Sequence, residues 1–176
     1  MAQVPESGRV EIAVCDNVVY VKAVGKCLQK QGIALHEFAS AMRKAGCREV
    51  ILDLNECAGM DSTFMGTVMS MKTSFQDADG LKVINMNPAC EKQLKGVGLL
   101  ALLDVSRKAV VMPHLRLKKL GDPAYGALER MEIILKLHKE LVEQNPDLNG
   151  EFGPCIEAIE QEIDERKRDG DGKAKS

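Results

Sequence analysis

Residues 51–66 read ILDLNECAGMDSTFMG, and they combine the end of a predicted strand with the start of a predicted helix. Its first residues continue the apolar run 49–54, which is typical of a central strand covered on both faces of a sheet. A loop at 55–61 follows, and Ser62 or its neighbour begins a helix in which apolar residues recur at helical intervals. A buried strand followed by a helix is the repeating unit of an α/β domain.

Apolar periodicity predicts further elements on both sides of this unit. Strands are expected at 9–14, 18–24, 81–86 and 109–112, and helices at 35–45 and 89–96. The turn Asp16-Asn17 joins the first two strands into a hairpin, whereas helical crossovers separate the later strands and favour parallel pairing. The sequence therefore predicts an α/β fold with a mixed, mostly parallel sheet and helices packed on it.

The composition changes at Asp122-Pro123, a pair that favours the start of a helix. An apolar stripe follows as far as Asn145-Pro146, which ends the helix, and a second amphipathic helix is expected to begin at Gly153-Pro154. Residues 123–176 hold 13 acidic and 8 basic side chains, whereas the preceding part of the chain carries a net charge of +3. The end of the chain is therefore an acidic helical pair.

The expected organisation has four parts: a tail at 1–8, a domain at 9–122, a helical extension at 123–165 and a polar, disordered tail at 166–176. Short amphipathic helices need tertiary packing to persist, so the extension must dock on another surface. Three surfaces remain open: its own domain, a second copy of the chain in a homodimer, and a partner protein.

Composition excludes several classes of function. A formal net charge of −2 does not favour nucleic-acid binding, and the longest mainly apolar run, 96–103, is too short to cross a membrane. The first seven residues lack the pattern of a secretion signal. The six cysteines lie at least ten residues apart and the three histidines are scattered, so no metal site and no cofactor are expected. We expect a cytoplasmic protein.

The triplet Asp61-Ser62-Thr63 lies where the second helix should begin, and each of its residues is a good helix cap. Capping alone would explain any one of them. A catalytic serine is less well supported, because no histidine lies nearby in the sequence and the Gly-x-Ser-x-Gly elbow is absent; a histidine distant in the sequence but close in space stays open. Residues 59–66 also lack the Gly-Lys-Ser or Gly-Lys-Thr ending of a P-loop. The chain is therefore expected to bind and not to catalyse.

The strand end Leu52-Asp53-Leu54, the seven-residue loop after it, the sequence Met60-Asp61-Ser62-Thr63 and Gly66 together resemble the signature of the STAS domain. The likeness is strongest to bacterial anti-sigma factor antagonists, and the order of elements from about residue 10 to 112 also fits this family. Phe64 departs from the family pattern, in which a small residue is common at this position.

The resemblance implies a regulatory role for these residues. Ser62 would be the phosphoacceptor, with Thr63 as the alternative acceptor, and Asp53, Asp61, Thr63 and Gly66 would form the switch loop and the partner-binding surface. In this family the partner is an anti-sigma factor that is also a serine kinase, and a serine phosphatase reverses the modification.

Two functions follow from this resemblance. In the first, the unphosphorylated chain sequesters the kinase-type anti-sigma factor and phosphorylation of Ser62 releases it, which regulates transcription by partner switching. The alternative is a STAS subunit that assembles or senses a ligand in a signalling or lipid-transport complex, where Ser62 only caps its helix.

Overall fold

The structure, a computed structural model, describes the backbone of residues 7–173 and the side chains of residues 7–170. Its centre is a sheet in the order β6-β5-β3-β2-β1-β7, and β4 pairs separately with β2. The strands are β1 (Arg9–Cys15), β2 (Val18–Cys27), β3 (Glu49–Asp53), β4 (Cys57–Met60), β5 (Gly80–Ile84), β6 (Asp104–Val105) and β7 (Lys118–Lys119).

Pairing in the sheet is mixed, as the sequence predicted. β1 runs antiparallel to both β2 and β7, whereas β2, β3, β5 and β6 pair in parallel. The hairpin turn forms at Asp16 and Asn17, both of which have positive φ; aspartate and asparagine tolerate that conformation better than most residues. The α/β class with a mixed, mostly parallel sheet is thus confirmed.

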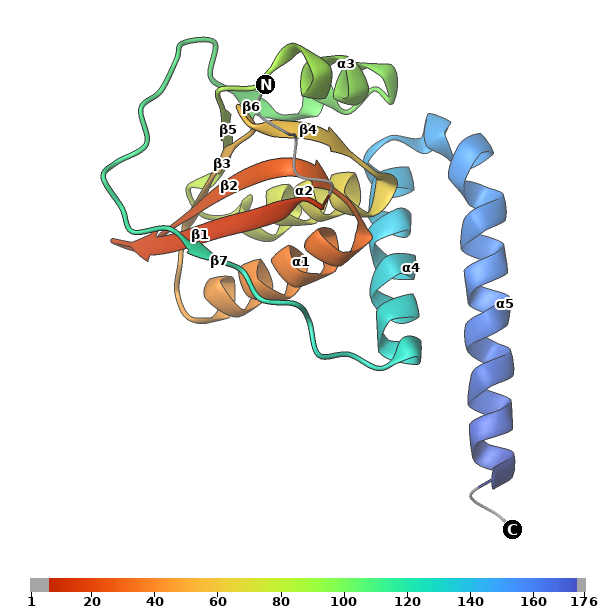
Figure 1. Cartoon of the computed structure of the whole chain (residues 1–176). Coiled ribbons are helices and arrows are strands. Elements are labelled where there is room, and N and C mark those ends of the chain that lie inside the picture. Colours follow the sequence, from red (N-terminus) through yellow and green to blue (C-terminus); the bar gives the residue numbers. More distant parts are fainter. Residues whose placement is uncertain (1–6, 174–176) are drawn as a thin grey trace.

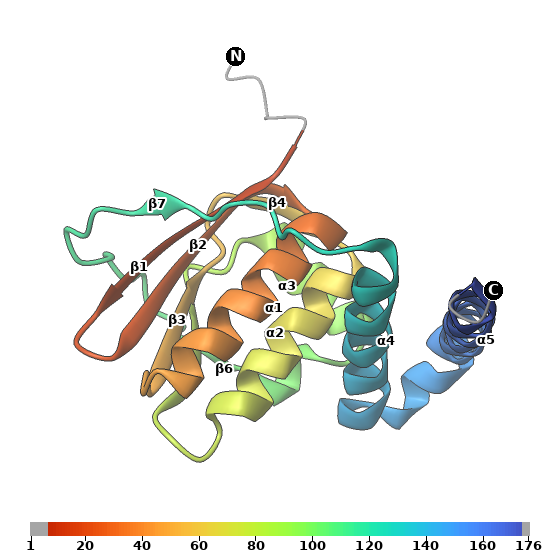
Figure 2. The same ribbon diagram turned by 90° about the horizontal axis from the view of Figure 1, so that it is seen from below.

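Five α-helices and two short 3₁₀ segments accompany the sheet in the described part of the chain: α1 (Gln29–Lys44), α2 (Ser62–Phe75), α3 (Pro88–Gly96), η1 (Leu100–Leu102), α4 (Ala127–Gln144), η2 (Pro146–Leu148) and α5 (Asn149–Lys173). Figures 1 and 2 show α1 and α2 side by side on one face of the sheet, α4 alongside α2, and α5 outermost beyond α4. Helix α4 therefore docks on the domain of its own chain, and α5 packs against α4.

The structure differs from the sequence prediction between residues 104 and 112. The expected strand at 109–112 does not form, and β6 takes the place beside β5 instead. The side chain of Asn85 explains this difference: its amide donates to the Val110 carbonyl at 2.7 Å, and its carbonyl accepts from the Val110 amide at 2.8 Å. Both backbone groups of Val110 are thus held by a side chain and not by a strand. The segment 57–60, expected to be loop, forms β4.

The boundaries of the extension also differ. The helix expected at Pro123 begins at Ala127, where the carboxylate of Glu129 accepts from the backbone amide of Gly126. The second helix begins at Asn149 and not at Gly153, so Pro154 lies inside α5.

The tail expected to be disordered at 166–176 continues α5 through residue 173. Ion pairs of Arg166 with Glu162 and of Lys167 with Glu132 support that last stretch of helix. Residues 1–6, most of the expected N-terminal tail, and residues 174–176 lie outside the described residues.

Candidate functional site

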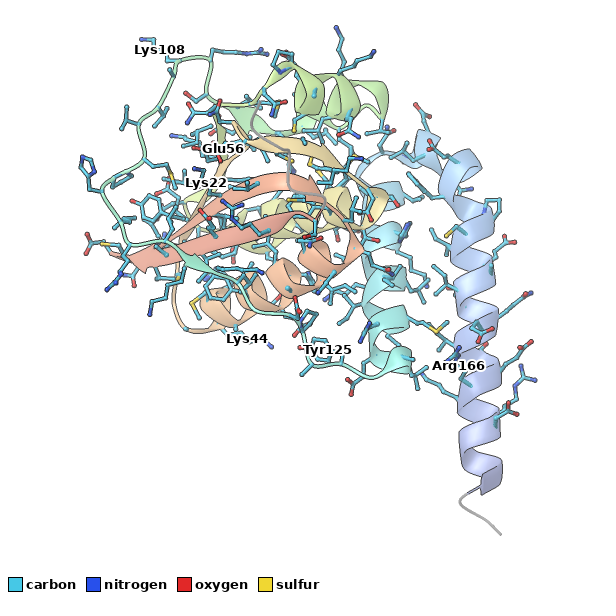
Figure 3. All side chains as sticks on the ribbon, in the orientation of Figure 1. Lys22, Lys44, Glu56, Lys108, Tyr125 and Arg166 are labelled. Atoms are coloured by element: carbon cyan, nitrogen blue, oxygen red, sulfur yellow. The ribbon has the colours of Figure 1, made fainter. Side chains whose placement is uncertain are left out.

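The loop between β3 and α2 is tied to α3 by two side chains. Asn87, the N-cap of α3, donates to the carbonyls of Leu54 and Cys57 at 2.7 Å each. The side chain of Gln93, on the same helix, binds both backbone groups of Met60. It accepts from the Met60 amide at 3.0 Å and donates to the Met60 carbonyl at 3.1 Å. An ion pair of 2.7 Å between Lys22 of β2 and Glu56 also connects the loop to that strand (Figure 3). These contacts fix the point at which α2 begins.

Asp53 lies at the end of β3 and is 6% exposed. One carboxylate oxygen accepts from the Asn55 amide at 2.8 Å, and the other accepts from the Asn85 side chain at 3.1 Å. Because Asn85 in turn holds Val110, the carboxylate links the β3 loop to the loop that follows β6. The structure therefore places Asp53 in a buried polar network and not on an exposed surface.

Asp61 is the N-cap of α2, and its Oδ1 accepts from the backbone amide of Phe64 at 2.8 Å. Ser62 follows as the first residue of the helix and is partly buried, whereas Thr63 is only 4% exposed. Phe64 is fully buried in the core. The residue that departs from the family pattern thus points into the domain, and of the two candidate acceptors Ser62 is the more accessible.

Gly66 lies beneath α4. A Cβ atom added to Gly66 would come within 2.6 Å of the Leu137 carbonyl oxygen and 2.9 Å of its Cβ. Real Cβ atoms do not approach other heavy atoms so closely, so only glycine lets the backbones of α2 and α4 pack at this distance. The part of α2 that was expected to bind a partner is here covered by the chain's own extension.

His138 was not among the residues that the sequence predicted for the site. Its Nε2 lies 3.0 Å from the Ser62 Oγ, although 76 residues separate the two in the chain. The ring is 5% exposed and packs edge-on against Phe152 of α5, with ring centroids 5.6 Å apart. In the sequence, the only signal for His138 was its position on the apolar stripe of the extension. The packing of α4 on α2 brings it to Ser62, and no local pattern predicts that packing.

The hydrogen bonds of His138 indicate the direction of the contact with Ser62. Its Nδ1 lies 2.8 Å from the Ile134 carbonyl, which can only accept, so Nδ1 carries a proton. In the neutral ring, Nε2 then accepts from the Ser62 hydroxyl. A serine hydroxyl that is hydrogen-bonded to an imidazole is the arrangement from which a nucleophilic serine can form. In this chain the imidazole is buried, packs edge-on against Phe152 and is oriented by a backbone carbonyl.

Metal-binding clusters and membrane-spanning helices are both absent from residues 7–170, the part of the chain whose side chains the structure describes. Among those residues no group of three or more histidine, cysteine, aspartate or glutamate side chains is placed to hold a metal ion. No helix in the same part is long and apolar enough to span a membrane.

No protein-family model matches the chain, and no curated protein matches its sequence. The chain is similar in structure to the anti-sigma factor antagonist SpoIIAA in its unphosphorylated form, with 16% identity and a TM-score of 0.49 over 56% of this chain and 89% of that one. An anti-sigma factor antagonist from Mycobacterium paratuberculosis matches with 17% identity and a TM-score of 0.48, over 59% and 89% of the two chains. The Bacillus cell fate determinant SpoIIAA in its phosphorylated form matches with 18% identity and a TM-score of 0.45, over 58% and 93%.

Proposed function

We propose that this chain is an anti-sigma factor antagonist that binds a kinase-type anti-sigma factor when unphosphorylated and releases it when Ser62 is phosphorylated. The observation that carries the proposal is the position of Ser62. It is the first residue of α2, it directly follows the capping residue Asp61, and its side chain is more accessible than that of Thr63. This is the junction at which the sequence resembles the family signature.

A phosphate at this position suits both states of a switch. The start of a helix offers unpaired backbone amides and the positive end of the helix dipole, so the phosphorylated domain should stay folded. Phosphorylation also adds a charge of about −1.5 to −2 next to Asp61. To bind a partner, this charged surface would have to lose its bound water, and the cost of that desolvation disfavours association. Phosphorylation should therefore weaken binding without unfolding the domain.

The test is to incubate the full chain with the candidate kinase and ATP and to map the phosphosite by mass spectrometry. We expect one phosphate on Ser62, its loss in Ser62→Ala and its retention in Thr63→Val. Ser62→Asp should abolish the complex with the anti-sigma factor, whereas Ser62→Ala should preserve it. A phosphosite remote from residues 61–63 would refute the assignment.

One observation favours the second function, a STAS subunit in which Ser62 is purely structural. The Ser62 hydroxyl already has a partner within the chain, His138. In that case Ser62→Asp would leave every partner interaction unchanged, although it would disturb the contact with α4. The same pair of variants, Ser62→Asp and Ser62→Ala, therefore distinguishes the two functions.

A further inference from the structure

Helix α4 lies along α2 and covers the region around Ser62 (Figure 2). Contacts at three places along the length of α2 define this interface. His138 meets Ser62 at the start of the helix, the backbone of Leu137 lies over Gly66, and Glu140 accepts from the hydroxyl of Thr73 at 2.5 Å. The Leu137 and Leu141 side chains are fully buried beside these contacts.

The imidazole of His138 occupies the side of the Ser62 hydroxyl on which their hydrogen bond lies, so a phosphoryl group that extends on that side would meet the ring. Nε2 lies 3.0 Å from the Ser62 Oγ and, in the neutral ring, accepts a hydrogen bond from its hydroxyl. A phosphoryl group on that side would add a phosphorus atom and three further oxygens in the direction that the imidazole now fills. The ring cannot simply turn aside, because Phe152 packs against it and Nδ1 is bound to the Ile134 carbonyl.

The extension can move away without unfolding the sheet. Residues 121–126, which lead into α4, have no regular secondary structure. Two contacts anchor them to α1: a hydrogen bond of 2.7 Å from the Tyr125 hydroxyl to Glu37 (Figure 3), and an ion pair of 2.9 Å between the exposed side chains of Asp122 and Lys30. Ion pairs between Lys139 and Glu160 and between Lys167 and Glu132 join α4 to α5, so the two helices should move together.

We propose that α4 is an autoinhibitory cover for Ser62: docked α4 and phosphorylated Ser62 exclude one another. The chain must open at the interface of α2 with α4 before a kinase can modify Ser62, and the phosphate then keeps α4 from docking again. The regulatory role rests on the proposed function, whereas the mutual exclusion rests only on the geometry of Ser62, Gly66 and His138.

Hydrogen exchange measured by mass spectrometry on the full chain tests the exclusion directly. One sample carries phosphoserine at position 62, introduced during translation, and a second carries Gly66→Ala, whose Cβ would meet the Leu137 carbonyl oxygen at 2.6 Å. Alanine is a better helix former than glycine, so Gly66→Ala should displace α4 while α2 stays helical. Gly96→Ala is the matched control, because a Cβ at the end of α3 meets nothing within 4 Å.

We expect peptides from α4 to exchange at least about tenfold faster in the phosphoserine and Gly66→Ala chains, which corresponds to about 1.4 kcal/mol in the docking equilibrium. Peptides from β2 and β3 and the Gly96→Ala chain should keep the exchange rates of the unmodified protein. Unchanged or slower exchange of α4 with phosphoserine at position 62 would overturn the proposal. If Gly66→Ala does not fold, the phosphoserine sample alone decides.

A kinase assay separates this proposal from the proposed function. Phosphorylation of Ser62 should be faster in Gly66→Ala than in the unmodified chain, and equal rates would overturn the cover. If α4 opens as expected but the kinase modifies neither chain, the exclusion is supported and the proposed function fails.

Discussion

Replacing Asp53 with asparagine tests the network that holds the loop before α2. The aspartate accepts two hydrogen bonds, from the Asn55 amide and the Asn85 side chain, on two different oxygens. An asparagine has one oxygen and one NH₂ group, so in either rotamer its NH₂ faces one of these donors. Asn85 cannot turn over in response, because Val110 binds both ends of its side-chain amide.

The size of the effect follows from this mismatch. A hydrogen bond to a charged acceptor contributes about 1.5–3 kcal/mol, and a buried donor left without an acceptor costs about 1–3 kcal/mol. Because Asp53 is 6% exposed, water can replace little of the lost contact. We expect Asp53→Asn to lower the free energy of unfolding by about 2 kcal/mol and to speed exchange of the Val110 amide.

Urea unfolding followed by circular dichroism gives the free energy of unfolding, and hydrogen exchange gives the local effect. Asp104→Asn is the control, because Asp104 is exposed on the edge strand β6. If both variants stay within about 0.5 kcal/mol of the unmodified chain, as surface substitutions usually do, the network does not stabilise the fold. If Asp53→Asn abolished partner binding while the free energy of unfolding stayed unchanged, Asp53 would belong to the partner-binding surface, as the family resemblance implied.

Two further predictions concern the helices around the site. Asp61→Ala removes the acceptor of the Phe64 amide, so it should lower the free energy of unfolding by about 1 kcal/mol; Asp61→Ser should restore most of this loss in the same urea assay, and no recovery would argue against capping. Burial lowers the pKa of His36, and Lys136 adds to this effect. The unfolded chain therefore binds the proton first, and stability is full above about pH 6.5 and falls as the pH drops below it. His36→Gln should remove up to about 1.4 kcal/mol per pH unit of that dependence between pH 7.5 and 5.5; identical pH dependence in both chains would contradict it.

Much of the central fold could be predicted because it depends on local pattern. Strand β3 is an apolar run bounded by polar residues, α2 has a capping residue and a helical repeat, and the hairpin has its turn residues at 16 and 17. The predictions from the sequence were wrong where a side chain distant in the sequence binds the backbone and outweighs the local pattern. Residues 109–112 read as a strand, yet Asn85 binds both backbone groups of Val110. The short strand β4 reads CAGM and has no β-branched or aromatic residue that would predict a strand, and its contacts with β2 and Gln93 position it.

The sequence alone predicted that Ser62 lies at the start of a helix after a buried strand, because capping and periodicity act over a few residues. It also predicted that an amphipathic extension had to dock somewhere. The place at which the extension docks depends instead on contacts between residues that are distant in the sequence. Contacts between α2 and α4 join residues about 70 positions apart, and they depend on shape at single atoms: the missing Cβ of Gly66 and the ring nitrogen of His138. No local pattern encodes such a fit, and it is this fit that brings His138 to Ser62.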